Sequence, residues 1–303
     1  MSTTTTPTTV TPPAKTPPPA RKPATGTPRR PRRVLSAIPA FLAWFAGLVF
    51  FLPVAWMVLT SFHAESDAAS NPPALTAPLT LDSYREFFSS DGASPWPPLI
   101  NSLTASLSST LLVLLLALPA AYALSIRPVK GWRDAMFFFL STKMLPAIAG
   151  LLPLYLFAKN TGLLDNIWLL VLLYTSMNLP IAVWMLQSFL AEVPPSLIEA
   201  AQIDGAKLPV ILFRVVGPVV APGIAATSLI CFIFSWNEML FAKVLTGVMA
   251  ETAPVFLTSF ITSQGLFLAQ VSAASLAISL PVLAAGFAAQ DKLVQGLSLG
   301  AVK

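Results

Sequence analysis

The sequence predicts an all-α protein that crosses a membrane several times. Apolar residues make up 55% of the 303 residues and charged residues only 10%, and the mean hydropathy is +0.73. A water-soluble domain of this composition would lack polar residues for its surface. The apolar runs are long and continuous, a pattern typical of membrane helices and not of the short alternating strands of a β-barrel.

Six runs are long enough to span a hydrocarbon core, which takes about 20 helical residues. Lys143 interrupts the third run and Glu238 the fifth. We expect the spans at 37–60, 101–126, 135–158, 166–190, 218–245 and 271–290.

The distribution of Lys and Arg predicts the orientation. The segment before residue 37 carries seven basic residues and no acid, and Arg127, Lys130 and Arg133 follow in the next loop on that side. The longest loop on the opposite side, 61–98, is rich in acidic residues. Basic loops stay in the cytoplasm, so both termini are predicted to be cytoplasmic in a multi-pass cell-membrane protein.

Two regions outside the spans have their own character. Residues 1–33 are dominated by Thr and Pro, which predicts a disordered, basic cytoplasmic tail ahead of a membrane domain at 34–303. A docking role for the tail is the less favoured alternative. In the 61–98 loop, a short amphipathic helix is predicted by the spacing of Leu81, Tyr84, Phe87 and Phe88.

The sequence offers little to build an active site from. His63 is the single histidine and Cys231 the single cysteine, so neither a metal site nor a His-paired nucleophile is expected. No Gly-Lys dipeptide occurs, so the chain lacks a phosphate-binding loop and no cofactor is expected on it. The net charge of +5 reflects membrane orientation, and no nucleic-acid partner is predicted.

Charges inside spans are costly and usually face a cavity or a partner. Lys143 and Glu238 could pair with each other and lock helices together, or they could border a polar path for a hydroxyl-bearing solute; both readings stay open. Pro146, Pro153 and Pro180 are expected to kink the spans. The candidates for the solute path are Lys143, Tyr174, Asn178, Trp236, Asn237 and Glu238. A membrane enzyme using Lys143 and Glu238 as acid and base is the alternative from another class.

A polar helix-turn-helix is predicted at about 194–217, between the fourth and fifth spans. Ser196 and Glu199 have the spacing of a capping box, and Gly205 is placed to end the helix in a left-handed conformation. A second helix would start at the Lys207-Leu208-Pro209 sequence. The apolar residues of the first helix, Leu197, Ile198, Ala201 and Ile203, would form an amphipathic knob for a partner protein.

The same segment resembles the signature of ATP-binding-cassette importer permeases. The sequence Glu199-Ala200-Ala201, Gly205, Val215 and Gly217-Pro218 follows E-A-A-x3-G-x9-I-x-L-P, except that Gly217 replaces Leu and Val215, which is similar in shape, replaces Ile. The chain resembles the carbohydrate-uptake branch and is similar to the second permease of the maltose importer. Within that branch, the stretches "LSTKMLP" (140–146), "NLPIAVWML" (178–186) and "SWNEMLF" (235–241) look like mannitol or sorbitol permeases.

The resemblance implies a type I permease fold without catalytic activity. It implies two ATPase subunits that bind ATP and Mg, a second and different permease chain, and an extracytoplasmic solute-binding protein. The ATPases would contact Ser196, Glu199, Ala200, Ala201, Asp204, Gly205, Ala206 and Pro218. The loop at about 246–270 would contact the binding protein. The implied solute is a polyol or sugar, and a disaccharide such as maltose or trehalose, or a non-carbohydrate solute, is the alternative.

Overall fold

The computed structural model describes residues 33–71, 76–89, 94–126, 129–262 and 265–301. The chain divides into two units, Met1–Phe51 and Leu52–Lys303, and helix α1 (Arg33–Ser61) begins in the first and ends in the second. Apart from Arg33, the predicted tail 1–33 lies outside the described residues. The described part of the chain is helical except for one hairpin of two-residue strands, so the predicted all-α class is confirmed.

Four helices are long and apolar enough to cross a membrane. They are α1, α4 (Trp96–Ser125), α7 (Ile167–Leu190) and α14 (Leu268–Ala301), and they cover the first, second, fourth and sixth predicted spans to within one residue. Two bent pairs of helices bring the number of spans to six if each pair counts as one.

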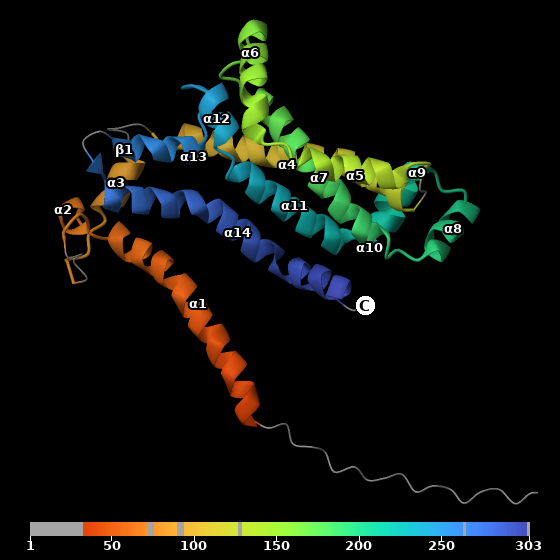
Figure 1. The fold of residues 1–303 in the computed structure, drawn as a ribbon, viewed down its shortest axis with the longest axis horizontal. Helices are drawn as coiled ribbons and strands as arrows, with labels where there is room; N and C mark the ends of the chain where they lie inside the picture. The colour runs from red at the N-terminus through yellow and green to blue at the C-terminus, as the bar shows by residue number, and fades with distance from the viewer. Residues whose placement is uncertain (1–32, 72–75, 90–93, 127–128, 263–264, 302–303) are drawn as a thin grey trace, which may run out of the picture. The chain divides into compact units, whose positions relative to one another are not determined.

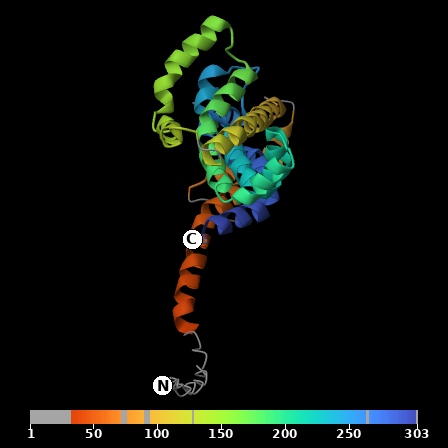
Figure 2. The same cartoon turned by 90° about the vertical axis from the view of Figure 1, so that its right-hand side faces the viewer.

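The third predicted span, 135–158, is one of these bent pairs. Helix α5 (Trp132–Thr142) ends just before Lys143, and the chain resumes as a 3-10 turn, η1 (Ala147–Gly150), followed by α6 (Leu151–Thr161), at an angle of 85° to α5. Pro146 causes the break, because its ring restricts the preceding residue to extended conformations. Figures 1 and 2 show α6 rising at a steep angle from the bundle, and Ala158 near its end is buried in one apolar cluster with Ala105 of α4 and Leu170 of α7.

The fifth predicted span, 218–245, is wrong at both ends. Helices α9 (Leu208–Val210) and α10 (Gly217–Val219) continue through a π-helical turn, η2 (Ile211–Val216), and meet α11 (Ala221–Trp236) at 87°. Pro218 and Pro222 flank this corner. Helix α11 stops at Trp236 and α12 (Leu240–Leu245) begins after a gap, so Glu238 lies between two helices instead of inside one.

The core of the second unit is built on α4, which packs most extensively against α7 and also contacts α11. Small residues make the close approach possible: Ala117 and Ala121 of α4 and Ala182 of α7 are fully buried in one apolar cluster. Short side chains let helix backbones come near each other in membrane proteins, where packing drives association. Helix α11 also packs against α14.

The short elements gather at the two ends of this bundle, as Figure 1 shows. One end carries α2 (Glu65–Ala68), α3 (Asp82–Phe88), α12, α13 (Ala253–Phe256), the 3-10 turn η3 (Leu257–Phe260) and the antiparallel hairpin of β1 (Ile261–Thr262) and β2 (Gly265–Leu266). The other end carries α8 (Pro195–Ile203) and α9.

Helix α3 confirms the short helix predicted in the 61–98 loop. Phe87 is buried, and its ring centroid lies 6.3 Å from those of Phe256 and Phe260. The Tyr84 hydroxyl lies 2.8 Å from the Ser61 hydroxyl at the end of α1. These contacts tie the loop to the helices of its own end.

Candidate functional site

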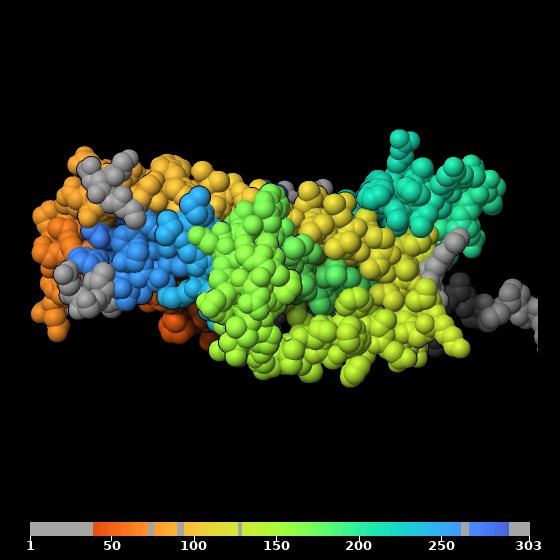
Figure 3. Space-filling view, turned by 90° about the horizontal axis from the view of Figure 1, so that it is seen from above, coloured from red at the N-terminus to blue at the C-terminus, as the bar shows by residue number. Residues whose placement is uncertain are grey.

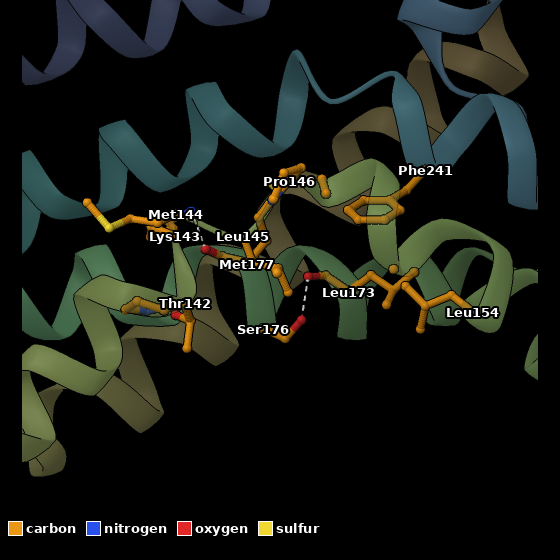
Figure 4. Close-up of a pocket in the computed structure, with 13 residues that line it drawn as sticks. Thr142, Lys143, Met144, Leu145, Pro146, Leu154, Leu173, Ser176, Met177 and Phe241 are labelled. Atoms are coloured by element: carbon orange, nitrogen blue, oxygen red, sulfur yellow. Dashed lines mark hydrogen bonds between the residues drawn. The ribbon is translucent and has the colours of Figure 1, made fainter.

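The break between α5 and η1 opens a pocket of about 610 Å³. One wall is the break itself, from Thr142 to Ala147, and the other is the face of α7 that carries Ser176, Met177 and Pro180, with Phe241 of α12 at one side (Figure 4). A proline-broken backbone is tolerated at membrane depth where it lines a cavity. The pocket therefore coincides with the interruption of a span.

Lys143 is exposed in this pocket and is held by backbone. Its Nζ donates a hydrogen bond to the carbonyl oxygen of Met177 at 2.5 Å. Pro180 lies one turn further along α7 and cannot donate a backbone N–H to the preceding turn, which loosens the carbonyls there. The lysine thus joins two proline-disturbed stretches and leaves two of its three N–H donors for other partners.

Of the two alternatives left open for Lys143 and Glu238, the ion pair is not formed. The Glu238 carboxylate instead accepts hydrogen bonds from the backbone N–H groups of Phe241 at 3.0 Å and Ala242 at 3.3 Å. Because Glu238 falls in the gap before α12, it satisfies N–H groups that the first turn of this helix leaves open. Within the described ranges, the ion pair between Arg85 and Asp82 is the one that forms.

The other path candidates divide by burial. Tyr174, Asn178 and Trp236 are buried between helices, whereas Asn237 is exposed and its amide donates to the Ile233 carbonyl of its own helix. Tyr174 contacts the chain near Glu238, its hydroxyl donating to the Glu238 carbonyl at 3.4 Å. The structure therefore brings Lys143 to the pocket but not Tyr174, Asn178 or Trp236.

Asn178 belongs to a polar cluster inside the bundle. Its amide donates to the Ser235 hydroxyl at 2.9 Å, and Ser235 lies 3.0 Å from the hydroxyl of Ser109, so α7, α11 and α4 are joined at one point. Hydrogen bonds of this kind between helices hold membrane bundles together. Two pocket residues outside the predicted set, Thr142 and Ser176, carry the hydroxyls beside Lys143; their nearness to Lys143 and Pro180 in the sequence is the signal that could have selected them.

The helix-turn-helix at the other end of the bundle begins differently from the prediction. Helix α8 starts at Pro195, with Pro194 as its N-cap and no capping bond from a side chain, so the Ser196–Glu199 capping box is wrong. Proline suits the first helical position, because its φ is already helical and its missing N–H is not needed there. This places Ser196 inside the first turn.

The end of α8 matches the prediction. Gly205 has φ of +75°, and the N–H groups of Gly205 and Ala206 donate to the carbonyls of Gln202 and Ala201 at 3.0 and 2.9 Å. This is the two-bond arrangement of a Schellman cap. The turn after α8 is therefore defined by local backbone bonds.

Burial divides α8 into an anchored face and a free face. Ile198 and Ala201 are buried in the core cluster around α4 and α7, contrary to the prediction that they face a partner. Ser196, Glu199, Ala200, Asp204, Gly205 and Pro218 are exposed, Ala206 is half-buried, and Ile203 is 86% exposed. In Figure 3 this segment, in teal, projects from the second unit. We call the exposed part of 195–206 the knob.

Residues 113–298 match the family model of the binding-protein-dependent transport system inner membrane component. The chain is 35% identical over 281 residues to a probable ABC transporter permease, y4oR, of Sinorhizobium fredii, covering 92% of this chain and 99% of that one. It is 33% identical to the diacetylchitobiose uptake permease DasC of Streptomyces coelicolor, over 86% of this chain and 93% of that one. It is also 33% identical to the trehalose transport permease SugB of Mycobacterium tuberculosis, over 83% and 92%.

A solved structure shares the fold. It is a chain of a bacterial ABC transporter involved in the import of the acidic polysaccharide alginate, with a TM-score of 0.71 and 22% identity over 88% of this chain and all of that chain. The bent pairs and long helices therefore form the fold of an importer permease. The chain belongs to the family of binding-protein-dependent transport system inner membrane components, as a non-catalytic, multi-pass permease of the carbohydrate-importing ABC type.

Proposed function

We propose that this chain is one of two different permeases in an importer that moves a neutral, hydroxyl-rich solute into the cell by alternating access. Two ATPase subunits would bind ATP and Mg and supply the energy, and an extracytoplasmic solute-binding protein would deliver the solute. The observation that carries the proposal is the knob: a capped helix with exposed Glu199, Asp204 and Ile203, anchored to the core by Ile198 and Ala201.

The knob suits transmission of force because its cap and its anchors fix it to the bundle. An ATPase surface that closed around the knob would pull on α7 through the short linker 191–194 and on α11 through α9, η2 and α10. We assign the ATPase contact to Ser196, Glu199, Ala200, Asp204, Gly205 and Pro218, with Ala201 and Ala206 setting the shape of the turn. Because the ATPases are cytoplasmic, this assignment places the knob on the cytoplasmic side, together with both termini.

We assign the solute path to the pocket in which Lys143 is exposed. We add Asn237 and Glu238 because they lie just before Phe241, which lines the same pocket and whose N–H donates to the Glu238 carboxylate. Two N–H donors of Lys143 suit the oxygen acceptors of a hydroxyl-rich solute. The hydroxyls of Thr142 and Ser176 already donate to the carbonyls of Phe139 and Leu173, so their oxygens suit the O–H donors of the same solute. The buried candidates Tyr174, Asn178 and Trp236 would shape this wall from behind.

Two solute classes have separate support. The sequence patterns around Lys143, Asn178 and Trp236 favour a polyol such as mannitol or sorbitol. The names of the relatives favour a disaccharide, since DasC is named for diacetylchitobiose and SugB for trehalose. A membrane enzyme using Lys143 and Glu238 lacks support, because the two side chains are bonded elsewhere and the family is non-catalytic.

The test is reconstitution of the complete complex in lipid with its binding protein. ATP hydrolysis is measured with mannitol, sorbitol, trehalose, maltose and diacetylchitobiose, and the solute that stimulates hydrolysis most is then followed into vesicles. Stimulation by mannitol or sorbitol alone selects the polyol, and stimulation by the disaccharides alone selects that class. An amino acid as the single stimulating solute would overturn the proposal.

A further inference from the structure

Residues 246–252 join α12 to α13. Together with Ala253, the first residue of α13, they are held by side chains from two other parts of the chain, and we call 246–253 the anchored loop. It lies at the end of the bundle opposite the knob (Figure 1). Its main anchor is Asp165, which stands between α6 and α7 and about 80 residues earlier in the chain. One oxygen of the Asp165 carboxylate accepts from the N–H groups of Gly247 and Ala250, both at 2.8 Å, and the other accepts from Met249 at 3.0 Å.

The backbone of Asp165 is shaped for this contact. Asp165 has φ of +56°, the one left-handed non-glycine residue in the described part of the chain. Its own N–H donates to the carbonyl of Leu245 at 2.9 Å. Aspartate tolerates this backbone conformation better than most residues, but it still costs free energy and persists where the surroundings enforce it. Here four hydrogen bonds between Asp165 and the segment 245–250 hold this conformation.

Gly247 makes room for the carboxylate. A Cβ atom at this position would lie 3.1 Å from an oxygen of Asp165 and 3.3 Å from its Cγ. Contacts this short are tighter than ordinary van der Waals packing, so one of the two groups would have to move. The glycine and the aspartate therefore act as a matched pair.

Helix α4 supplies the second anchor. The amide of Asn101 donates to the carbonyls of Met249 and Glu251, both at 2.9 Å, and the Ser102 hydroxyl accepts from the N–H of Ala253 at 2.8 Å. The anchored loop is thus fixed on both of its backbone edges, N–H groups by Asp165 and carbonyls by Asn101.

This fixed loop presents apolar side chains to its surroundings. Val248 is 89% exposed and Met249 is 79% exposed, although side chains of Asp165 and Asn101 bond the backbone of Gly247, Met249, Ala250 and Glu251. Large apolar side chains held outward on an ordered backbone are typical of a protein contact. Preordering the loop removes an entropy cost from the binding step.

We propose that Asp165 is a positioning residue for the solute-binding protein: its carboxylate holds the anchored loop in the one conformation that presents Val248 and Met249 to that partner. The inference rests on the proposed function, because that function places a binding protein at this end of the bundle. Asp165 acts through the loop and does not itself touch the partner. Its substitution should therefore weaken docking without slowing the cycle of a docked complex.

The test is a titration of the reconstituted complex with its binding protein, loaded with whichever sugar or polyol of the panel stimulates the wild type most. For Asp165→Ala, the concentration of loaded binding protein at half-maximal ATP hydrolysis should rise about tenfold. This is the size expected when binding has to meet the entropy cost of ordering one or two side chains. The rate at saturating binding protein should stay within about twofold of the wild type.

Two further variants separate positioning from general damage. Gly247→Ala leaves the charge in place but crowds the carboxylate, and should give the same rise in half-saturating concentration. Asp165→Asn keeps an oxygen for Gly247 and Ala250 and tolerates the left-handed backbone, and should give a smaller rise. Asp82→Asn removes an exposed carboxylate from a nearby helix and serves as the charge control, with no change expected.

The possible outcomes are distinct. If the wild type is stimulated and Asp165→Ala and Gly247→Ala keep its half-saturating concentration, the inference is overturned and the proposed function stands. If both variants lower the saturating rate and leave the half-saturating concentration unchanged, Asp165 acts in transmission and positioning is overturned. If no loaded binding protein stimulates the wild type, the proposed function fails and the inference with it.

Discussion

The knob and the anchored loop occupy opposite ends of the same bundle and are held in place by opposite means. The knob takes its conformation from neighbours in the sequence: Pro194 and Pro195 start α8, the Gly205 cap ends it, and two apolar side chains fix it to the core. The anchored loop takes its conformation from Asp165 and Asn101, which lie about 80 and 150 residues away in the chain. Damage to the knob should therefore be local, whereas damage to the loop can arise from either of two distant elements.

The largest effect is expected where the knob depends on one backbone angle. Gly205→Val forces a β-branched residue into a left-handed conformation, which should unwind the cap and lower co-purification of the ATPase by more than about tenfold. Gly162→Val is the matched control, because Gly162 has φ of +69° at the end of α6, far from the knob. Equal loss of ATPase co-purification in both variants would contradict the assignment of the ATPase contact to the knob.

The next test separates the shape of the knob from its charge. Within the described residues, Glu199 is exposed and makes no capping bond, so Glu199→Lys should leave the melting temperature of the chain unchanged. Co-purification of the ATPase should fall about tenfold, as for a reversed charge at an interface. Glu199→Gln, measured beside it, should give a smaller loss. A fall in melting temperature with either variant would contradict the free position of this side chain.

A moderate effect is expected at the loop. Asn101→Ala removes the donor to two loop carbonyls and should lower the free energy of local opening by about 1–3 kcal/mol. Hydrogen exchange of the N–H groups at 247–253 measures this change. Asn237→Ala is the control, since Asn237 bonds within its own helix and should leave exchange in the loop unaltered. Unchanged protection in Asn101→Ala would mean that Asp165 alone orders the loop.

The smallest effect is the pH dependence of the loop. Burial by itself would raise the pKa of Asp165, but the N–H groups of Met249, Ala250 and Gly247 outweigh it and hold that pKa below its ordinary value of 3.8. The stabilisation from Asp165 is therefore complete above the ordinary value and is lost as the pH falls through the lower folded pKa.

Glu251 should show the opposite sign. Burial, and then the charge of Asp165, raise the pKa of Glu251 above its ordinary 4.5, so its ionised form opposes folding once the pH exceeds that value. Glu251→Gln should slow hydrogen exchange in the loop slightly at pH 7 and leave it unaltered below pH 4. Faster exchange at pH 7 would contradict this assignment.

Sequence reasoning succeeded where the signal is local or compositional. Apolar runs located every long helix, the spacing around Tyr84 located α3, and Gly205 located the end of α8, because hydropathy, helical period and left-handed caps depend on nearby residues. A kink at Pro146 was expected, but not a turn of 85°, and the corner flanked by Pro218 and Pro222 was missed, since hydropathy measures composition and does not register the angle between two helices. The start of α8 was misplaced because the preference of Pro195 for the first helical turn outweighed the spacing of Ser196 and Glu199.

The candidate site was less predictable than the fold. Lys143 lines the pocket, and its place in a solute path stays a prediction. Glu238, considered as its partner, caps α12, and the continuous apolar run gave no sign that α12 is a separate helix. The sequence alone does not distinguish an Asn178 that faces a solute path from one that faces another helix, and in the structure Asn178 donates a hydrogen bond to Ser235. Asp165 went unnoticed because its three N–H partners are brought to it only by the tertiary fold.

Helix α7 connects these two ends, and its 24 residues make it about 36 Å long. Asp165 stands just before its first residue and the linker to the knob follows its last. Each residue added to such a helix turns one end by about 100° relative to the other, whereas a full turn of 3.6 residues brings it round again. The number of residues in α7 therefore sets the direction in which the knob points relative to the anchored loop. Inserting or deleting one residue in α7 would rotate the two ends against each other even if neither end were itself changed.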